Sequence, residues 1–241
     1  LHYPLRRQRQ MCIRDRFKND QAMTVVVSII LVYTSLNICG NLVLYFFRFD
    51  VGNEGAYSIF AAVAFAAQVL VMMVIPLLRK RFSKSQLFIS GFIIQIAGFA
   101  VILIMAFAKL YTPQSWYILC LPGILIYLGY GMLNVIMTIF LSDSVDYGEV
   151  MNGTREESVI FSMQTFTVKL ASGVAVFLAG LVVDWIHLDT AAAVQTQDTL
   201  DALRMWMTIP SVILLIVGIF VFKRFYKLDD ARMEEIKSKL N

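Results

Sequence analysis

The chain has 241 residues, of which 59% are apolar and only 16% are charged. Soluble domains contain about 45–50% apolar and about 25% charged residues, so this composition excludes an ordinary soluble domain and indicates a membrane protein. The formal net charge of +4 arises within residues 1–16, which contain five Arg and one Asp, while the remainder has 16 basic and 16 acidic residues.

The first 16 residues differ in character from everything that follows. The stretch RRQRQMCIRDR can be back-translated, base for base, into a sequence that resembles an adapter of transposase-based DNA libraries. LH before it fits the same oligonucleotide, and YPL fits a sample index. We interpret residues 1–16 as translated adapter rather than a natural basic leader, so no nucleic-acid partner is expected. We expect the genuine sequence to begin near Phe17 and the chain to be a fragment.

Six apolar stretches in the remaining chain are long enough to cross a bilayer, which takes about 20 mainly apolar residues. Turn-forming residues separate them, and a soluble protein of this size could not bury so many. The predicted spans are residues 23–47, 57–78, 86–107, 116–141, 159–186 and 205–222. The sequence predicts an all-α polytopic membrane protein, with a six-helix bundle at 23–226 and an amphipathic tail helix at 227–241.

The basic residues indicate how the bundle is oriented. If Phe17 is cytoplasmic, twelve Lys and Arg residues flank the spans on the cytoplasmic side, and only Arg48, Lys109 and Arg204 lie on the other side. Cytoplasmic loops are enriched in Lys and Arg. We therefore expect a multi-pass protein of the plasma (inner) membrane with both ends of the genuine sequence in the cytoplasm.

One charge interrupts an otherwise apolar span. Lys169 lies near the middle of the fifth span, where a lysine costs about 2.5–3.5 kcal/mol to insert. At 100° per residue, a polar stripe that includes Lys169 falls within roughly 80° of one helix face. The stripe contains Ser158, Ser162, Thr165, Lys169 and Ser172, with Gln164 at its edge, and the opposite side carries Phe166, Leu170 and Val174.

We expect this stripe to face a water-filled cavity. The alternative is that its hydroxyl groups strengthen helix packing while Lys169 snorkels toward the membrane surface, which its depth makes awkward. No acidic residue lies mid-span in residues 17–241, so the partner of Lys169 is expected outside this chain. The first span has a weaker polar stripe around Asn37 and Asn41. These two side chains either bind a polar ligand or bond across helices.

Charged residues gather between the fourth and fifth spans, at 142–158. Asp143, Asp146 and Glu149 follow one another at i,i+3 spacing on one face of a helix end, and Arg155 and Glu157 come after a glycine turn. A solvated charged loop is the simplest interpretation, and a gate of breakable ion pairs is the alternative. Carboxylates at a helix C-terminus oppose the helix dipole, so cationic partners are expected.

The sequence contains few features that would indicate an enzyme. Beyond residue 16, the cysteines are Cys39 and Cys120, both in apolar runs, and the one histidine is His187 at a span boundary. No G-x-S-x-G or H-E-x-x-H motif occurs. A polytopic membrane enzyme is therefore a remote alternative, and no catalytic residue, cofactor or metal site is expected.

A resemblance to a known family covers nearly all of residues 17–241. The stretch DSVDYGEVMNGTREESVIFSMQTFTVKLASG at 143–173 closely resembles the tenth and eleventh helices of the glycoside–pentoside–hexuronide:cation symporters. Its specific motifs are D-Y-G-E-x-x-x-G-x-R and Q-T-x-x-x-K, and YFFRFDVGNE and RFYKL also look like family landmarks. These symporters form the melibiose-permease-like branch of the major facilitator fold. The chain would then be the C-terminal six of twelve helices, with residues 17–22 ending the central cytoplasmic loop.

The resemblance implies uptake of a sugar coupled to Na⁺ or H⁺ by alternating access. It places Lys169 near the cation site, and Gln164 and Thr165 in the sugar pathway. The residues that match the family's cytoplasmic gate are Asp143, Asp146, Glu149, Arg155 and Glu157. The carboxylates that hold the cation lie in the family's N-terminal six helices, so that half, the sugar and the lipid bilayer are the expected partners.

One departure weakens the sugar assignment. Asn134 stands where an aromatic residue is expected in the melibiose branch, and aromatic rings commonly stack on sugars. A pentoside, a hexuronide or a non-sugar substrate therefore stays open. The alternative function is another major facilitator transporter, proton-coupled and specific for a drug or another solute.

Overall fold

The computed structural model describes residues 19–153, 155 and 157–240. The stretch interpreted as adapter, 1–16, lies outside the described residues. The long helices are α2 (Asp20–Tyr45), α3 (Ala56–Leu78), α4 (Lys84–Phe107), α5 (Cys120–Asn152), α6 (Glu157–Trp185) and α7 (Gln197–Phe225), and the tail forms α8 (Asp230–Leu240). A π-helical turn, η1 (Phe46–Asp50), extends α2, and a 3₁₀ turn, η2 (Trp116–Leu119), precedes α5.

Within the part of the chain that the structure describes, six helices are long and apolar enough to cross a membrane. The prediction of an all-α, six-span protein is therefore confirmed. Only helices satisfy their backbone hydrogen bonds within one segment in lipid, which is why apolar run length predicts them so well.

The predicted bounds were wrong at two places where helices continue into charged sequence. The fourth span was expected to end at residue 141, but α5 continues to Asn152 and ends where Gly153 takes a positive φ of 70°. The sixth span was expected to start at residue 205, but α7 starts at Gln197 behind a capping Thr196. A prediction from apolar runs does not include these additional helical turns, because they carry charged side chains whose partners lie elsewhere in the fold.

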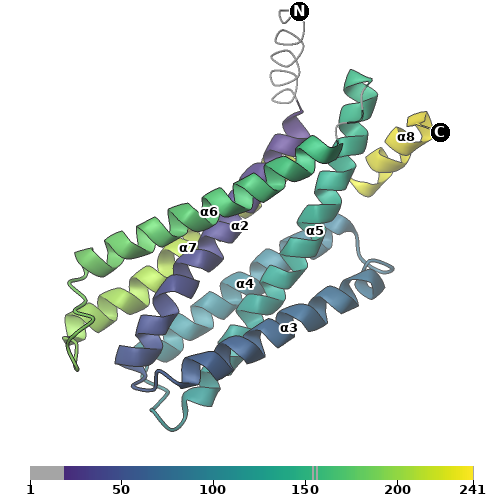
Figure 1. The fold of residues 1–241 in the computed structure, drawn as a ribbon. Coiled ribbons are helices and arrows are strands. Elements are labelled where there is room, and N and C mark those ends of the chain that lie inside the picture. The colour runs from purple at the N-terminus through teal and green to yellow at the C-terminus, as the bar shows by residue number, and fades with distance from the viewer. Residues whose placement is uncertain (1–18, 154, 156, 241) are drawn as a thin grey trace, which may run out of the picture.

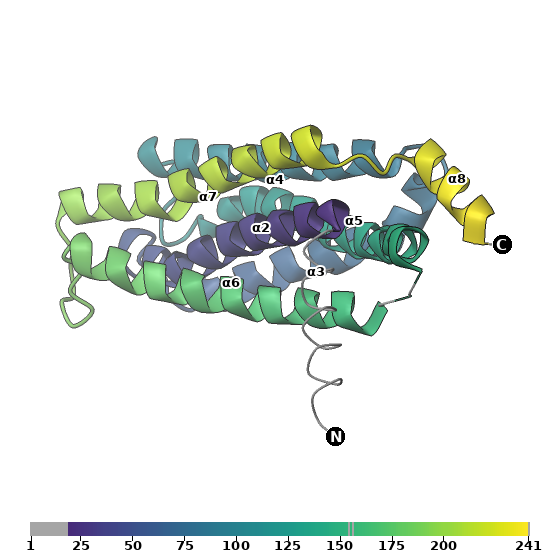
Figure 2. The same cartoon turned by 90° about the horizontal axis from the view of Figure 1, so that it is seen from above.

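The helices form three layers (Figures 1 and 2). Helices α2 and α5 lie in the middle layer, α4 and α7 cover one side, and α6 and α3 lie on the other. The main packing pairs are α4 with α5, α2 with α7, α3 with α5, and α2 with α6. Helices α2, α4 and α6 begin at the end of the bundle where α8 lies, which we call the tail end. The opposite end, where η1 lies, is the far end.

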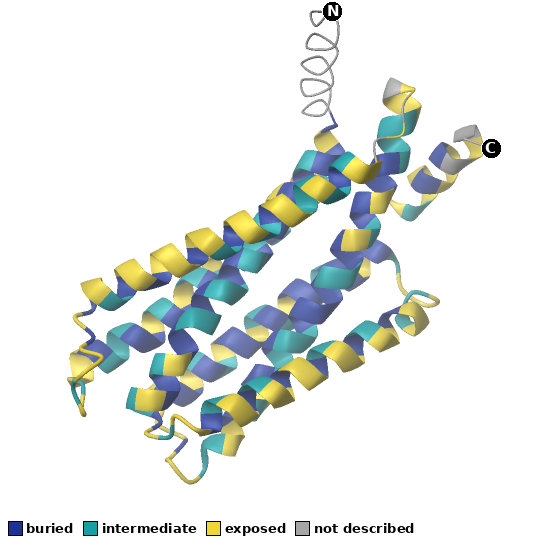
Figure 3. Cartoon of the chain, viewed as in Figure 1, coloured by how far each residue is buried: buried dark blue, intermediate teal, exposed yellow. Residues whose placement is uncertain are grey.

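Helices α4 and α5 approach each other closely. A Cβ atom on Gly129 of α5 would lie 2.6 Å from the backbone N of Gln95 on α4, so only glycine permits this approach. By contrast, only 28% of the most apolar window of α3, and the same share of α6, is buried, against 61% for α2 with η1. Figure 3 shows exposed residues along the outer sides of α3 and α6. These two helices therefore have faces that the bundle itself does not cover.

Candidate functional site

An open groove runs along the polar stripe of α6. It is lined by Ser158, Phe161, Ser162, Thr165, Phe166 and Lys169. The hydroxyl of Ser162 donates to the Ser158 carbonyl at 2.6 Å, and that of Thr165 donates to the Phe161 carbonyl at 3.1 Å. Since these bonds use the hydroxyl hydrogens, the oxygen lone pairs stay available as acceptors.

The opposite side of α6 packs on α2 through small residues, including Thr167, Ala171, Ala175 and Ala179. The polar stripe consequently points away from the bundle, and Lys169 is exposed. No described residue forms an ion pair with Lys169. Gln164 is half-buried beside the groove and is not part of its lining.

The prediction that Phe166 lies opposite the stripe was wrong, because Phe166 lines the same groove. It lies three residues before Lys169, which is about 60° around the helix. Leu170 and Val174 are exposed on the neighbouring apolar side. The groove thus combines hydroxyls, an ammonium group and two aromatic rings.

The asparagines of α2 bond mainly to their own helix. The Asn37 amide donates to the Tyr33 carbonyl and the Asn41 amide donates to the Asn37 carbonyl, both at 2.7 Å. On the same helix, the Tyr33 hydroxyl accepts a hydrogen bond of 2.7 Å from the Asn134 amide of α5. Asn134 therefore ties α5 to α2, and Asn41 additionally lines a second pocket between α2 and α6.

At the tail end, Arg155 joins three carboxylates between α5 and α6. Its guanidinium donates to Glu149 at 2.9 Å, to Asp146 at 3.0 Å and to Glu157 at 3.3 Å. The hydrogen bonds that Arg155 donates to Glu149, Asp146 and Glu157 raise its pKa above the ordinary value. We call these four residues the Arg155 cluster.

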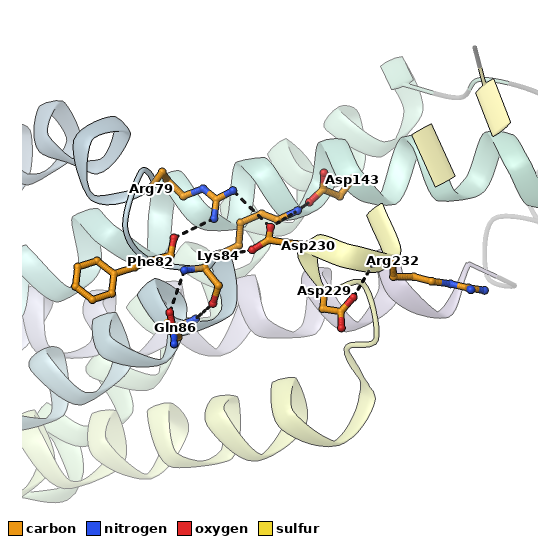
Figure 4. Close-up of polar contacts among 9 residues, drawn as sticks. Arg79, Phe82, Lys84, Gln86, Asp143, Asp229, Asp230 and Arg232 are labelled. Atoms are coloured by element: carbon orange, nitrogen blue, oxygen red, sulfur yellow. Dashed lines mark hydrogen bonds and ion pairs between the residues drawn. The ribbon is translucent and has the colours of Figure 1, made fainter. Parts of the chain in front are cut away.

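Asp143 is not part of that cluster, although the sequence grouped it with Asp146 and Glu149. Its buried carboxylate pairs with the buried Lys84 ammonium at the start of α4. Lys84 also lies 3.3 Å from Asp230 of α8, and Arg79 lies 3.5 Å from the same carboxylate. Figure 4 shows the four side chains converging, and we call them the Lys84 cluster.

Two opposing effects determine the pKa of the Asp230 carboxyl. Partial burial by itself would raise its pKa, but the nearby charges of Lys84 and Arg79 and hydrogen bonds from Lys84 lower it below its ordinary value of 3.8. The apolar side of the tail holds α8 in place, since Leu228, Met233 and Ile236 are buried against Tyr147 and Tyr226. Sequence reasoning missed this contact because Lys84 appeared to be an ordinary loop charge and Asp230 an ordinary charge of the predicted tail helix.

A third charged network closes the far end. Arg204 of α7 holds Asp50 of η1 with two hydrogen bonds, of 2.8 Å and 2.5 Å, and donates to Asp201 at 2.7 Å. The Tyr111 hydroxyl donates to the same Asp50 carboxylate at 2.7 Å. Arg204 was counted as a loop residue in the sequence, but it lies within α7 and is buried.

No group of three or more His, Cys, Asp or Glu residues that could hold a metal ion occurs in the described part of the chain. The chemistry available on the uncovered faces is therefore that of hydroxyls, amides, carboxylates, Lys169 and aromatic rings. Such an arrangement can bind a polar solute reversibly.

Comparison with known proteins points the same way. The family described as MFS/sugar transport protein matches residues 8–230. The chain is 26% identical over 229 residues to an uncharacterized symporter, YjmB, of Bacillus subtilis, covering 95% of this chain and 48% of the relative. It is 25% identical over 215 residues to the isoprimeverose transporter of Lactiplantibacillus pentosus, covering 88% and 43%.

A third relative is the raffinose carrier protein of Pediococcus pentosaceus, 22% identical over 225 residues, with 92% of this chain and 34% of the relative covered. The chain thus spans between a third and a half of the length of these curated relatives. The family match begins inside the stretch 1–16, so the adapter origin of that stretch stays a hypothesis.

Proposed function

Because this chain belongs to the MFS/sugar transport protein family, we propose that it is part of a cation-coupled symporter for a sugar, glycoside, pentoside or hexuronide. The coupling ion is Na⁺ or H⁺, and transport proceeds by alternating access. The chain supplies the C-terminal six helices, and a further six carry most of the cation site. The tail end is cytoplasmic, and the membrane is the plasma (inner) membrane.

The single observation that carries this proposal is the exposed polar face of α6 in the middle of an apolar span. Lys169, Thr165 and Ser162 line one groove that faces away from the bundle. Charged residues in membrane helices face a protein interior or a water-filled cavity. A second helical half placed against this face would bring its carboxylates to Lys169 and close the sugar pathway.

The charged clusters at the tail end support a gate. Arg155 is half-exposed and bonds carboxylates on both sides of the α5–α6 turn, so its ion pairs can break and re-form in water. In this proposal, Asp146, Glu149, Arg155 and Glu157 form the breakable part of the cytoplasmic gate. Asp143 takes part through Lys84.

The test is uptake by the complete protein in cells that lack other sugar carriers. The panel contains raffinose, isoprimeverose and lactose, each measured with and without a Na⁺ gradient and a pH gradient. We expect cation-dependent accumulation of at least one sugar. Movement of a non-sugar solute alone would favour another major facilitator transporter, and chemical conversion of a substrate without its movement would favour an enzyme.

Replacing Lys169 with Val sharpens this test. We expect cation-coupled accumulation to fall on the order of tenfold or more, because the charge that faces the cation site is lost. The amount of protein in the membrane should stay normal, since Lys169 is exposed and has no described partner. Leu170→Val, on the exposed apolar side of the same helix, is the matched control. Wild-type cation dependence in the Lys169 variant would refute the pathway role.

A further inference from the structure

A second pocket lies between α2 and α6 toward the far end. It has a volume of about 360 Å³ and is lined by Asn41, Tyr45, Val176, Ala179, Gly180, Val183 and Asp184. Small-molecule sites typically occupy about 300–1,000 Å³. The pocket is therefore large enough for one ring of a small polar ligand.

The pocket continues the face of α6 that carries Lys169. Counted at 100° per residue, Val176 and Gly180 lie about 20° from Lys169, and Asp184 lies about 60° from it. Along the axis, Asp184 lies about 22 Å from Lys169. The groove at Lys169 and the pocket at Asp184 are thus two separate places on the same side of α6, and a ligand that moves along this side passes both.

The polar groups of the pocket are unused within the described residues. Asp184 is exposed, and its carboxylate has neither a hydrogen bond nor an ion pair there. Asn41 donates its amide N–H to the Asn37 carbonyl, which leaves the amide oxygen as an acceptor. The half-buried Tyr45 adds a hydroxyl that makes no hydrogen bond inside the described part of the chain.

These groups fit the hydroxyls of a sugar better than a bare cation. A carboxylate and an amide oxygen accept hydrogen bonds from hydroxyl donors, and a phenol can donate or accept. Val176, Ala179 and Val183 provide an apolar wall for the C–H groups of a sugar ring. A tightly held metal cation needs several close oxygen ligands, and Asp184 is the one carboxylate in this lining.

We propose that the pocket formed by Asn41, Tyr45 and Asp184 is a sugar-binding subsite at the far end, which the substrate occupies before it reaches the groove at Lys169. The inference rests on the proposed sugar transport. It assigns Asp184 a binding role that the family motifs around Lys169 and Arg155 do not include.

Two variants test the subsite in the complete protein. Asp184→Asn removes the charge with almost no change of volume. Gly180→Leu fills the pocket, and the structure tolerates it because a Cβ atom at Gly180 meets nothing within 4 Å. Asp198→Asn, an exposed carboxylate near the same end, and Val174→Phe, on the exposed apolar side of α6, are matched controls.

The measurement is the initial uptake rate of the panel sugar that the wild-type protein accumulates best, as a function of its external concentration. Loss of a hydrogen bond to a charged group weakens binding by about tenfold, so we expect KM to rise by about that factor in Asp184→Asn. We expect KM to rise in Gly180→Leu as well, because the leucine side chain occupies the space of the ligand. Maximal rate and membrane abundance should stay close to wild type. The controls should keep the wild-type KM.

The outcomes separate the two proposals. If the wild-type protein takes up no sugar, the proposed function fails and the subsite fails with it. If wild-type uptake is normal but Asp184→Asn keeps the wild-type KM, the subsite alone is refuted. Should Gly180→Leu reduce membrane abundance, Asp184→Asn decides the question, because it leaves packing intact. A lower maximal rate at unchanged KM would also contradict a role in first binding.

Discussion

The two ends of the bundle differ in how deeply their charged side chains are buried. At the far end, the Arg204 and Asp50 side chains are only 3% and 4% exposed, and Tyr111 and Asp201 add further hydrogen bonds to the pair. At the tail end, the Arg155 side chain is 48% exposed. A closed network fixes helix positions, whereas an exposed one can change partners. The far-end network thus fixes α7, η1 and the loop after α4 relative to one another, whereas the ion pairs of Arg155 at the tail end can change.

The Lys84 cluster lies between these extremes. Lys84 and Asp143 are each 6% exposed, but Asp230, which shares Lys84, is 42% exposed. A buried pair that touches a half-exposed carboxylate on a separate tail helix can be loosened without unfolding the bundle. The far-end network therefore holds the fold most strongly, the Lys84 cluster less strongly and the Arg155 cluster least.

The largest expected effect is at Arg204. Arg204→Ala leaves the Asp50 carboxylate buried without its cation, which should lower the free energy of unfolding by about 4–5 kcal/mol. Thermal unfolding in detergent measures it. Asp201→Asn, which alters the 40%-exposed partner of the same arginine, should change stability by less than about 1 kcal/mol. Equal losses in the two variants would show that the far end is not closed.

A smaller loss is expected at Lys84. Lys84→Ala leaves the Asp143 carboxylate without its partner. Because the neighbouring Asp230 is partly exposed to water, we expect the free energy of unfolding to fall by about 3 kcal/mol. Lys84→Arg keeps the positive charge and should therefore retain most of the stability that Lys84→Ala loses. Equilibrium unfolding of both variants provides the measurement. A Lys84→Ala variant as unstable as Arg204→Ala would remove the distinction between the two buried pairs.

Arg155 should affect transport rather than stability. We expect Arg155→Ala to unfold at the wild-type temperature, because its ion pairs are exposed to solvent and exposed pairs contribute little. Sugar retention by preloaded cells should fall if the Arg155 cluster closes the cytoplasmic side. Arg232→Ala is a matched control, since Arg232 pairs with Glu235 within α8. Normal retention with lowered stability would reverse the expected roles of the two ends.

The smallest effect concerns pH. Folding lowers the pKa of Asp230 below its ordinary value of 3.8. The ion pairs of Asp230 therefore stabilise the docking of α8 fully above pH 3.8, and this stabilisation is lost as the pH falls through the lower pKa of the folded state. At neutral pH the docking of α8 should therefore not vary. A fluorophore at Ser238→Cys, with the other cysteines replaced, would report release only in strong acid.

In Asp230→Asn this acid transition should disappear, and in Asp229→Asn it should persist, because Asp229 pairs with neither Arg79 nor Lys84. Release of α8 near pH 6 in the unsubstituted tail would contradict the ion-pair account of its docking.

The amino-acid sequence by itself determined the six helices and the polar stripe of α6. Both depend on short-range properties, namely run length in an apolar segment and a repeat of 100° per residue. The same reasoning failed at the start of α7, where Arg204 ended the apolar run, and at Phe166, which was placed on the wrong side of α6. It also grouped Asp143 with Asp146 and Glu149 because spacing along one helix was the available guide.

Only the tertiary structure decided which charges meet. Lys84 finds Asp143 on another helix, Arg204 finds Asp50 across the far end, and Asp184 comes to lie beside Asn41 in one pocket. These partners are far apart in the sequence, and no local pattern encodes their meeting. The pairing of Lys84 with Asp143 and of Arg204 with Asp50 follows from the layering of the helices and from the high free-energy cost of burying a charge without a partner. The exposed Asp184 is placed by the packing of α6 on α2 alone.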